Sequence, residues 1–139
     1  MHIIAAILLV AALTPQPHEP DEPDELNPDA VMIAKVIAVE APYCSEAEQE
    51  AIAWVILNRV DTDGYGMGCS VEYVVTFPNQ FAYYEDTEYS NELYDLALRV
   101  LEDWQAGAEG IGKQWLWFTG DGKRNTFRDA YKGGNTKTF

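Results

Sequence analysis

The segment that most constrains the fold is residues 51–57, AIAWVIL, which would be apolar on every side of a helix. Ser45 followed by Glu48 forms a capping box that starts such a helix, and the helical pattern continues to about Val60. A helix that is apolar all round has to be covered by other elements. The sequence therefore predicts a domain built around a buried central helix.

Capping signals predict two more helical segments. Asn27 and Pro28 form an N-cap followed by a proline at the first helical position, which predicts a helix over about 28–41. Ser70 precedes a short piece over 71–76 that is helical or extended. These segments supply part of the cover for the central helix.

The C-terminal half contains one more helix and a hairpin. Ser90 caps a helix over roughly 90–106, which Gly107 ends. In residues 113–127, KQWLWFTGDGKRNTF, an aromatic run and a polar run flank a Gly-Asp-Gly turn, as in a β-hairpin. The expected fold class is α+β, mainly α: a compact domain with a buried central helix and a small C-terminal hairpin.

The N-terminal region predicts an exported protein. Residues 2–13, HIIAAILLVAAL, have the length of an export signal's hydrophobic region and are short for a membrane span. Residues 1–14 are therefore expected to be a signal peptide or a membrane anchor, with cleavage left open. Residues 15–27 alternate proline with acids and predict an extended linker. The domain proper is 28–139, and its expected location is the periplasm, the cell wall or the extracellular space.

Composition excludes several classes of function. The formal net charge of -14 argues against nucleic-acid binding, which needs a basic surface. Both histidines, His2 and His18, precede the domain, so a Ser-His or Cys-His pair is not available and a zinc site lacks its usual ligands. We therefore expect no metal and no cofactor. Cys44 and Cys69 either form a disulfide, worth on the order of 3 kcal/mol, or are two buried free thiols.

The chemistry that remains is that of carboxylates, and Glu40 is the best-placed candidate. On a helix Ile33, Ile37 and Glu40 share one face, so the carboxyl group lies at the inward end of an apolar stripe. A partly desolvated carboxyl group there is a candidate general acid. Asn58 lies on a similar face of the central helix, which suggests a shared site. The alternatives are that Glu40 pairs with a cation such as Arg59 or reaches solvent at the helix end.

Short motifs distributed over residues 31–131 occur in a fixed order. They are Glu40-Ala41, Gln49, Leu57-Asn58-Arg59-Val60, Cys69 with Val74 or Val75, Gln80-Phe81, and Asn125-x-Phe127. This ordered set resembles the family of bacterial cell wall hydrolases typified by the germination-specific spore cortex-lytic enzyme (SleB-like). The resemblance implies a lysozyme-like domain that acts on peptidoglycan glycan strands, with Glu40 as acid/base. We expect a monomer, and both a bacterial wall-remodelling enzyme and a phage endolysin fit the sequence.

The chain departs from the family pattern after the first glutamate. The family often has Glu-Ala-Arg-Gly-Glu, whereas Pro42, Tyr43 and Cys44 follow here, so the second acid is missing. The final segment also lacks the usual histidine. One carboxylate suffices if the 6-hydroxyl of muramic acid attacks the anomeric carbon. We therefore expect a lytic transglycosylase that cleaves the β-1,4 bond between N-acetylmuramic acid (MurNAc) and N-acetylglucosamine (GlcNAc).

Three alternatives to this reaction stay open. Water as the nucleophile would make the protein a muramidase, and a non-catalytic peptidoglycan-binding module would grip the same strand without cutting it. The missing histidines disfavour an amidase. Three groups of side chains are expected to contact substrate. The amides of Asn58, Gln80 and Asn125 would hydrogen-bond the sugar, and the rings of Phe81, Tyr83 and Trp117 either stack on it or pack in the core. Arg128 would meet a lactyl or peptide carboxylate.

Overall fold

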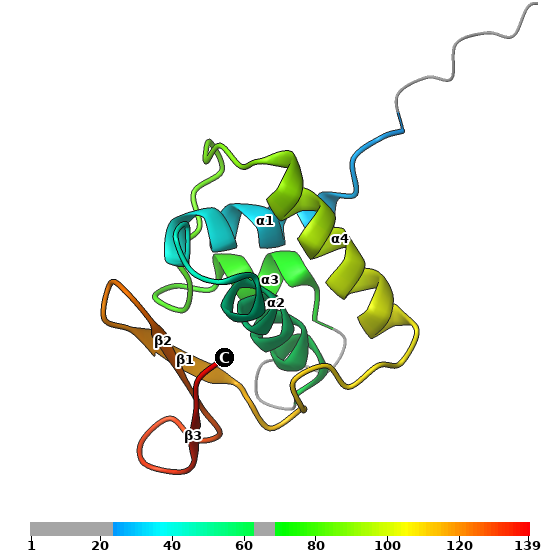
Figure 1. The fold of residues 1–139 in the computed structure, drawn as a ribbon. Helices are drawn as coiled ribbons and strands as arrows, with labels where there is room; N and C mark the ends of the chain where they lie inside the picture. The colour runs from blue at the N-terminus through cyan, green and yellow to red at the C-terminus, as the bar shows by residue number, and fades with distance from the viewer. Residues whose placement is uncertain (1–23, 63–68) are drawn as a thin grey trace, which may run out of the picture.

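The computed structural model describes residues 24–62 and 69–139. This part of the chain contains four helices and a three-stranded antiparallel sheet (Figure 1). The elements are α1 (Pro28–Glu40), α2 (Glu46–Asp61), α3 (Val71–Thr76), α4 (Asn91–Gln105), β1 (Trp117–Gly120), β2 (Asn125–Arg128) and β3 (Thr136–Lys137). The expected fold class, α+β and mainly α, is confirmed.

Each helix begins at the capping residue that the sequence indicated. The Asn27 side chain accepts the backbone N–H groups of Asp29 and Ala30, and Ser45, Ser70 and Ser90 each accept the N–H of the residue three positions later. A cap of this kind stabilises a helix by about 1 kcal/mol. The segment 71–76, which the sequence left open, is helical.

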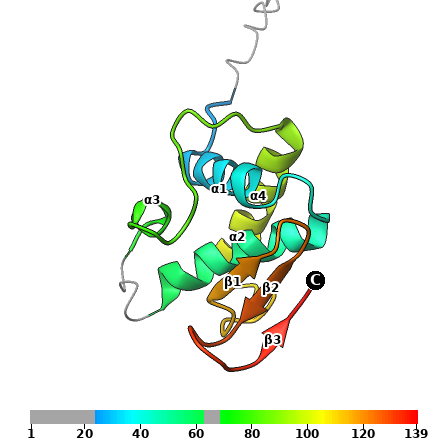
Figure 2. The same cartoon turned by 90° about the vertical axis from the view of Figure 1, so that its left-hand side faces the viewer.

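The central helix is α2. Its residues from Ala51 to Val60 are all buried, and α1, α3 and α4 contact it. Figures 1 and 2 show α1 and α4 on one side of α2 and the sheet on the other. Because each fully buried aliphatic side chain contributes roughly 1.5–3 kcal/mol, this helix supplies much of the stability of the domain.

The sheet begins with the expected hairpin. Trp117 is opposite Arg128 and Gly120 is opposite Asn125 in the antiparallel pairing of β1 with β2. A third strand, β3 (Thr136–Lys137), pairs with the other edge of β2 and was not expected from the sequence. A strand of two residues is too short to show a periodic pattern. Phe127 on β2 is fully buried and joins the sheet to the helical core.

The chain approaches α1 through residues 24–27, which have no regular secondary structure. The backbone N–H of Asn27 donates to the Tyr94 hydroxyl at 3.0 Å, and this hydrogen bond ties the segment before α1 to α4. Residues 1–14, expected to be a signal or anchor, and residues 15–23 of the expected linker lie outside the described residues. Across 24–62 and 69–139, no helix combines the length and the apolar character that crossing a membrane requires.

Candidate active site

Glu40 is the last residue of α1. Pro42 cannot continue the helix, and Ala41 caps it by donating its N–H to the Ile37 carbonyl at 2.9 Å. Ile37 is fully buried, whereas Glu40 is half-buried at the end of the same apolar stripe. The Oε1 atom of Glu40 accepts the backbone N–H of Ala82 at 2.7 Å. One oxygen of the carboxylate is therefore held by the loop between α3 and α4.

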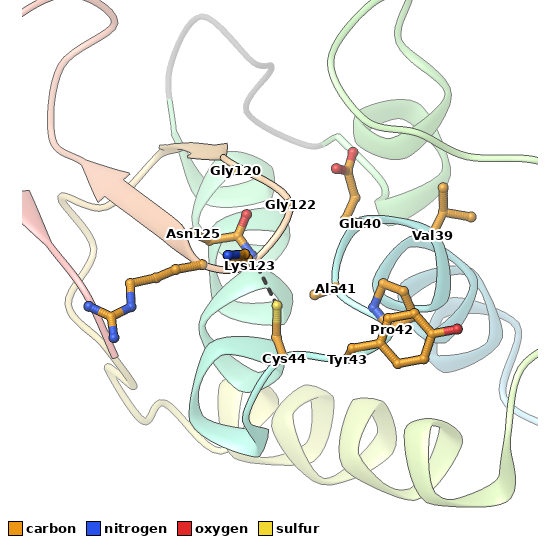
Figure 3. A pocket seen from close by; sticks show the side chains of 11 residues that line it. Val39, Glu40, Ala41, Pro42, Tyr43, Cys44, Gly120, Gly122, Lys123 and Asn125 are labelled. Atoms are coloured by element: carbon orange, nitrogen blue, oxygen red, sulfur yellow. Dashed lines mark hydrogen bonds between the residues drawn. The ribbon is translucent and has the colours of Figure 1, made fainter.

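A pocket of about 480 Å³ opens beside Glu40. Residues 39–44, from the end of α1 and the α1–α2 loop, form one wall, and residues 120 and 122–125 of the hairpin form the other. Figure 3 shows Glu40 and Asn125 extending from opposite walls. The volume lies in the range of ligand pockets, roughly 300–1,000 Å³. Among the described residues that line the pocket, Glu40 is the only acid.

The loop between α1 and α2 is fastened at the Ala41 carbonyl. It accepts the N–H of Cys44 at 3.3 Å and the Nε2 group of Gln49 at 3.0 Å, which satisfies a carbonyl left unpaired at the end of a helix. Tyr43 lies inside this turn and is 99% exposed although it lines the pocket. The loop thus presents an aromatic ring to solvent at the rim of the pocket.

The acid in the hairpin turn is used within the turn. The Oδ1 atom of Asp121 accepts the backbone N–H groups of Lys123 and Arg124 at 2.9 Å each. These hydrogen bonds hold the pKa of the Asp121 carboxyl group below its ordinary value. Its charge therefore stabilises the turn, while Lys123 and Arg124 contribute two cationic residues to the wall opposite Glu40.

Gln80 and Phe81 are organised by a buried arginine. The Nη1 group of Arg59 donates to Gln80 Oε1 at 3.0 Å, and the guanidinium lies 4.7 Å from the centre of the Phe81 ring. Its Nε group donates to the Leu116 carbonyl at 2.7 Å. The residue after Phe81 is the one that hydrogen-bonds Glu40. Arg59, considered from the sequence as an ion-pair partner of Glu40, therefore anchors the loop that holds the carboxylate.

Asn58 lies apart from this pocket. Its Nδ2 group donates to the carbonyls of Gly112 and Trp115 at 3.0 Å each, which ties α2 to the segment before β1. Asn58 lines a different cavity of about 290 Å³ that also involves Trp104. The expectation that Asn58 and Glu40 share one site is not met, because each lines its own pocket.

The remaining predicted contact residues lie outside the pocket lining. Trp117 and Arg128 are opposite each other at the end of the hairpin remote from its turn, and both are half-buried. Tyr83 is half-buried, and burial, followed by the charges of Glu85 and Glu72, raises the pKa of its hydroxyl group. Substrate contacts by these residues stay predictions.

Cys44 and Cys69, both within the described residues, do not form the disulfide that the sequence left open. The Cys44 side chain is turned toward the hairpin, where its Sγ atom accepts from Asn125 Nδ2 at 3.6 Å. Burial and a hydrogen bond with Glu48 raise the pKa of the Cys44 thiol, which disfavours the nucleophilic thiolate. In the described part of the chain, no three His, Cys, Asp or Glu side chains are grouped to hold a metal ion.

Several side chains in the pocket walls and behind them were not assigned to a site from the sequence. Tyr43 and Cys44 face the pocket, although the sequence indicated only a departure from a family motif at both positions and a possible disulfide at Cys44. Lys123 and Arg124 line the opposite wall, and the sequence places both in a group of C-terminal bases that is either a patch for an anionic ligand or a solvated tail. Glu48 is 5% exposed, and its capping-box position gave no sign that the carboxylate would turn inward.

Comparison with known proteins gives one match. The model of a family described as Cell Wall Hydrolase matches residues 45–139, from the N-cap of α2 through the sheet. Glu40 lies just before the matched range. No curated protein and no solved structure matches the chain.

Proposed function

Because the chain belongs to the cell wall hydrolase family, we propose that it is a lytic transglycosylase that cleaves the MurNAc-GlcNAc β-1,4 bond of peptidoglycan. Family membership implies a hydrolytic enzyme and a peptidoglycan substrate. The observation that carries the finer proposal is the single acid, Glu40, among the described residues that line a pocket of about 480 Å³. A glycosidase normally uses two carboxyl groups, so a lone one favours a reaction in which the substrate supplies the nucleophile.

In the proposed reaction Glu40 acts first as an acid and then as a base. It gives its proton to the glycosidic oxygen while the bond between that oxygen and the anomeric carbon of MurNAc breaks. The 6-hydroxyl of the same MurNAc attacks the anomeric carbon and returns its proton to Glu40. The products are a 1,6-anhydro-MurNAc end and a free GlcNAc 4-hydroxyl, and no water is consumed.

The hydrogen bond from Ala82 supports this role by fixing the direction of the carboxylate. It engages Oε1 of Glu40 at 2.7 Å, and the opposite oxygen is the one proposed to exchange a proton with substrate. Because the donor is a backbone N–H in a loop fastened by Arg59, the carboxylate is oriented before substrate binds. Preorganisation of this kind lowers the cost of reaching the transition state.

The walls of the pocket suit a glycan that carries anionic groups. Tyr43 offers an exposed ring on which a sugar face can stack. Lys123 and Arg124 are on the opposite wall, where they can meet the lactyl or stem-peptide carboxylate of muramic acid. Gln80 and Phe81 are proposed to act indirectly, through the loop that holds Glu40. The contact with a lactyl or peptide carboxylate, which the sequence assigned to Arg128, is therefore proposed for Lys123 and Arg124 instead.

The proposed substrate also bears on location. Peptidoglycan lies outside the cytoplasmic membrane, so an enzyme that degrades it must be exported. The apolar residues 2–13 are proposed to serve that export as a cleaved signal or a retained tether.

The test is the product pattern of a peptidoglycan digest. Purified sacculi are incubated with the enzyme, and the released fragments are separated and weighed by mass spectrometry. Anhydro-muropeptides, lighter than the hydrolysed products by one water, support transglycosylation. Reducing MurNAc ends would contradict transglycosylation and indicate a muramidase. Freed stem peptides would indicate an amidase, and binding without release of fragments would indicate a non-catalytic module.

A further inference from the structure

A buried carboxylate that the proposed reaction does not use lies behind the hairpin wall of the pocket. Glu48 on α2 is 5% exposed, and Asn125 at the start of β2 is 3% exposed. The Oε2 atom of Glu48 accepts both the backbone N–H and the side-chain Nδ2 group of Asn125, each at 3.2 Å. One carboxylate oxygen thus holds two donors of the same residue.

The second hydrogen of the Asn125 Nδ2 group is directed to Cys44. Its Sγ atom accepts from Nδ2 at 3.6 Å, and Glu48 is among the groups that raise the pKa of this thiol. Hydrogen bonds from Asn125 to Glu48 and to Cys44 therefore connect the hairpin with α2 and with the α1–α2 loop. An ionised carboxylate only accepts hydrogen bonds, so the Asn125 amide must direct its nitrogen, and not its oxygen, toward Glu48.

This orientation leaves the carboxamide oxygen on the pocket side. Figure 3 shows the Asn125 oxygen directed away from Cys44 and toward Gly120, which also lines the pocket. A methyl group added at Gly120 would lie 2.8 Å from Oδ1, so glycine makes room for the oxygen there. Among the described residues, every fully buried side-chain oxygen or nitrogen has a hydrogen-bond partner. Within the described part of the chain, no residue donates a hydrogen bond to Asn125 Oδ1. This oxygen is therefore not one of the fully buried atoms, and it is open to the solvent in the pocket.

We infer that Glu48 is a positioning residue: it locks the Asn125 carboxamide so that Oδ1 faces the pocket and accepts a hydrogen bond from a substrate N–H group. In the proposed peptidoglycan substrate this donor is the 2-acetamido N–H of a sugar bound between Asn125 and Glu40, so the inference rests on the proposed function. Glu48 itself does not touch the substrate. Its effect on substrate binding is transmitted through the orientation of the Asn125 side-chain amide.

The kinetic arm of the test compares variants at Glu48 and Asn125 on soluble peptidoglycan fragments. Glu48→Ala is expected to raise KM about tenfold and to change kcat less than threefold, because a hydrogen bond to a charged group contributes enough for that factor. Glu48→Gln restores KM to within about threefold, since its carbonyl oxygen can accept the same two N–H groups. Glu50→Ala is the matched control: Glu50 is on the same helix and pairs at the surface with Arg99.

A double mutant separates positioning from a general loss of structure. If Glu48 acts through Asn125, Glu48→Ala added to Asn125→Ala raises KM no further than Asn125→Ala alone. Additive effects of the two substitutions would overturn the inference. So would a Glu48→Ala enzyme whose KM stays within twofold of wild type.

A second readout does not depend on activity. In wild-type protein the side-chain NH₂ resonances of Asn125 are expected to be shifted and protected from solvent exchange, and Glu48→Ala should return them to ordinary asparagine values. Unprotected resonances in the wild type would refute the locked amide even if the enzyme is active. Wild-type protein that releases no fragment from peptidoglycan would instead refute the proposed function, while the resonance measurement still decides the role of Glu48.

Discussion

The substitution Glu40→Gln tests the proposed catalytic group most directly. Glutamine keeps a carbonyl oxygen where Glu40 Oε1 accepts the Ala82 N–H at 2.7 Å, so the loop contact can persist. What it removes is the exchangeable proton. General acid–base catalysis contributes about 10²- to 10⁴-fold, and we expect the rate of anhydro-muropeptide release to fall by that factor. Substrate binding, measured by co-sedimentation with sacculi, should change less than threefold.

The structure separates this loss from a loss of stability. Glu40→Ala removes the acceptor as well as the proton and leaves the Ala82 N–H unpaired in a half-buried position. That change costs about 1 kcal/mol and should lower Tm by roughly 4 °C, whereas Glu40→Gln should stay within about 1 °C of wild type. Glu72→Gln, on an exposed carboxylate of α3, is the matched control. Release by Glu40→Gln within threefold of the wild-type rate would refute the assignment.

Three further substitutions test the rim of the pocket, the Cys44 thiol and the packing against the central helix. Tyr43→Ala should raise KM for peptidoglycan fragments about threefold to tenfold, while Tyr131→Ala, at another exposed tyrosine that does not line the pocket, should leave it unchanged; equal effects would remove the stacking role. The raised pKa of Cys44 favours the thiol in the folded state. The stability that this thiol contributes is fully present below the ordinary pKa of 9.0 and is lost as pH rises through the higher folded value. Chemical denaturation should show this loss in the wild type and less of it in Cys44→Ser. Gly110→Ala should lower the free energy of unfolding by about 2 to 4 kcal/mol in thermal melts, because φ at Gly110 is +57° and the added methyl would lie 2.1 Å from the Trp54 indole of α2. Gly107→Ala has open space around its added methyl and should lose only about 1 kcal/mol.

Local signals were sufficient to predict the helical part of the fold. The caps at Asn27, Ser45, Ser70 and Ser90 are short-range hydrogen bonds between residues two or three positions apart, so the sequence contains all the information that they need. The continuous apolar run of α2 predicted its burial for the same reason. Strand β3 has only two residues and depends on pairing with the edge of β2, which no local pattern reports.

The sequence predicted Glu40 and Asn125 as residues of one site, and both line the pocket, whereas the expected neighbour Asn58 does not. Helical periodicity placed the carboxylate at the end of a buried stripe, as observed. Whether Asn58 lies beside it depends on how α1 and α2 cross, which periodicity does not specify; the structure directs Asn58 to the Gly112 and Trp115 carbonyls. The hairpin turn forms the second wall through contacts between residues far apart in the sequence, such as Glu48 with Asn125.

The fate of every acid near the pocket bears on how many carboxyl groups the reaction can use. Asp121 is committed to the N–H groups of its own turn, and Glu48 is committed to Asn125 behind the wall. Cys44 occupies the position at which the resemblance expects a second acid, and its raised pKa favours an uncharged thiol there. An acid placed at position 44 would put a second carboxylate beside the buried Glu48, and like charges in contact repel. Among the described residues that line the pocket, Glu40 is thus the only acid, which is why the proposed reaction assigns both proton transfers to it.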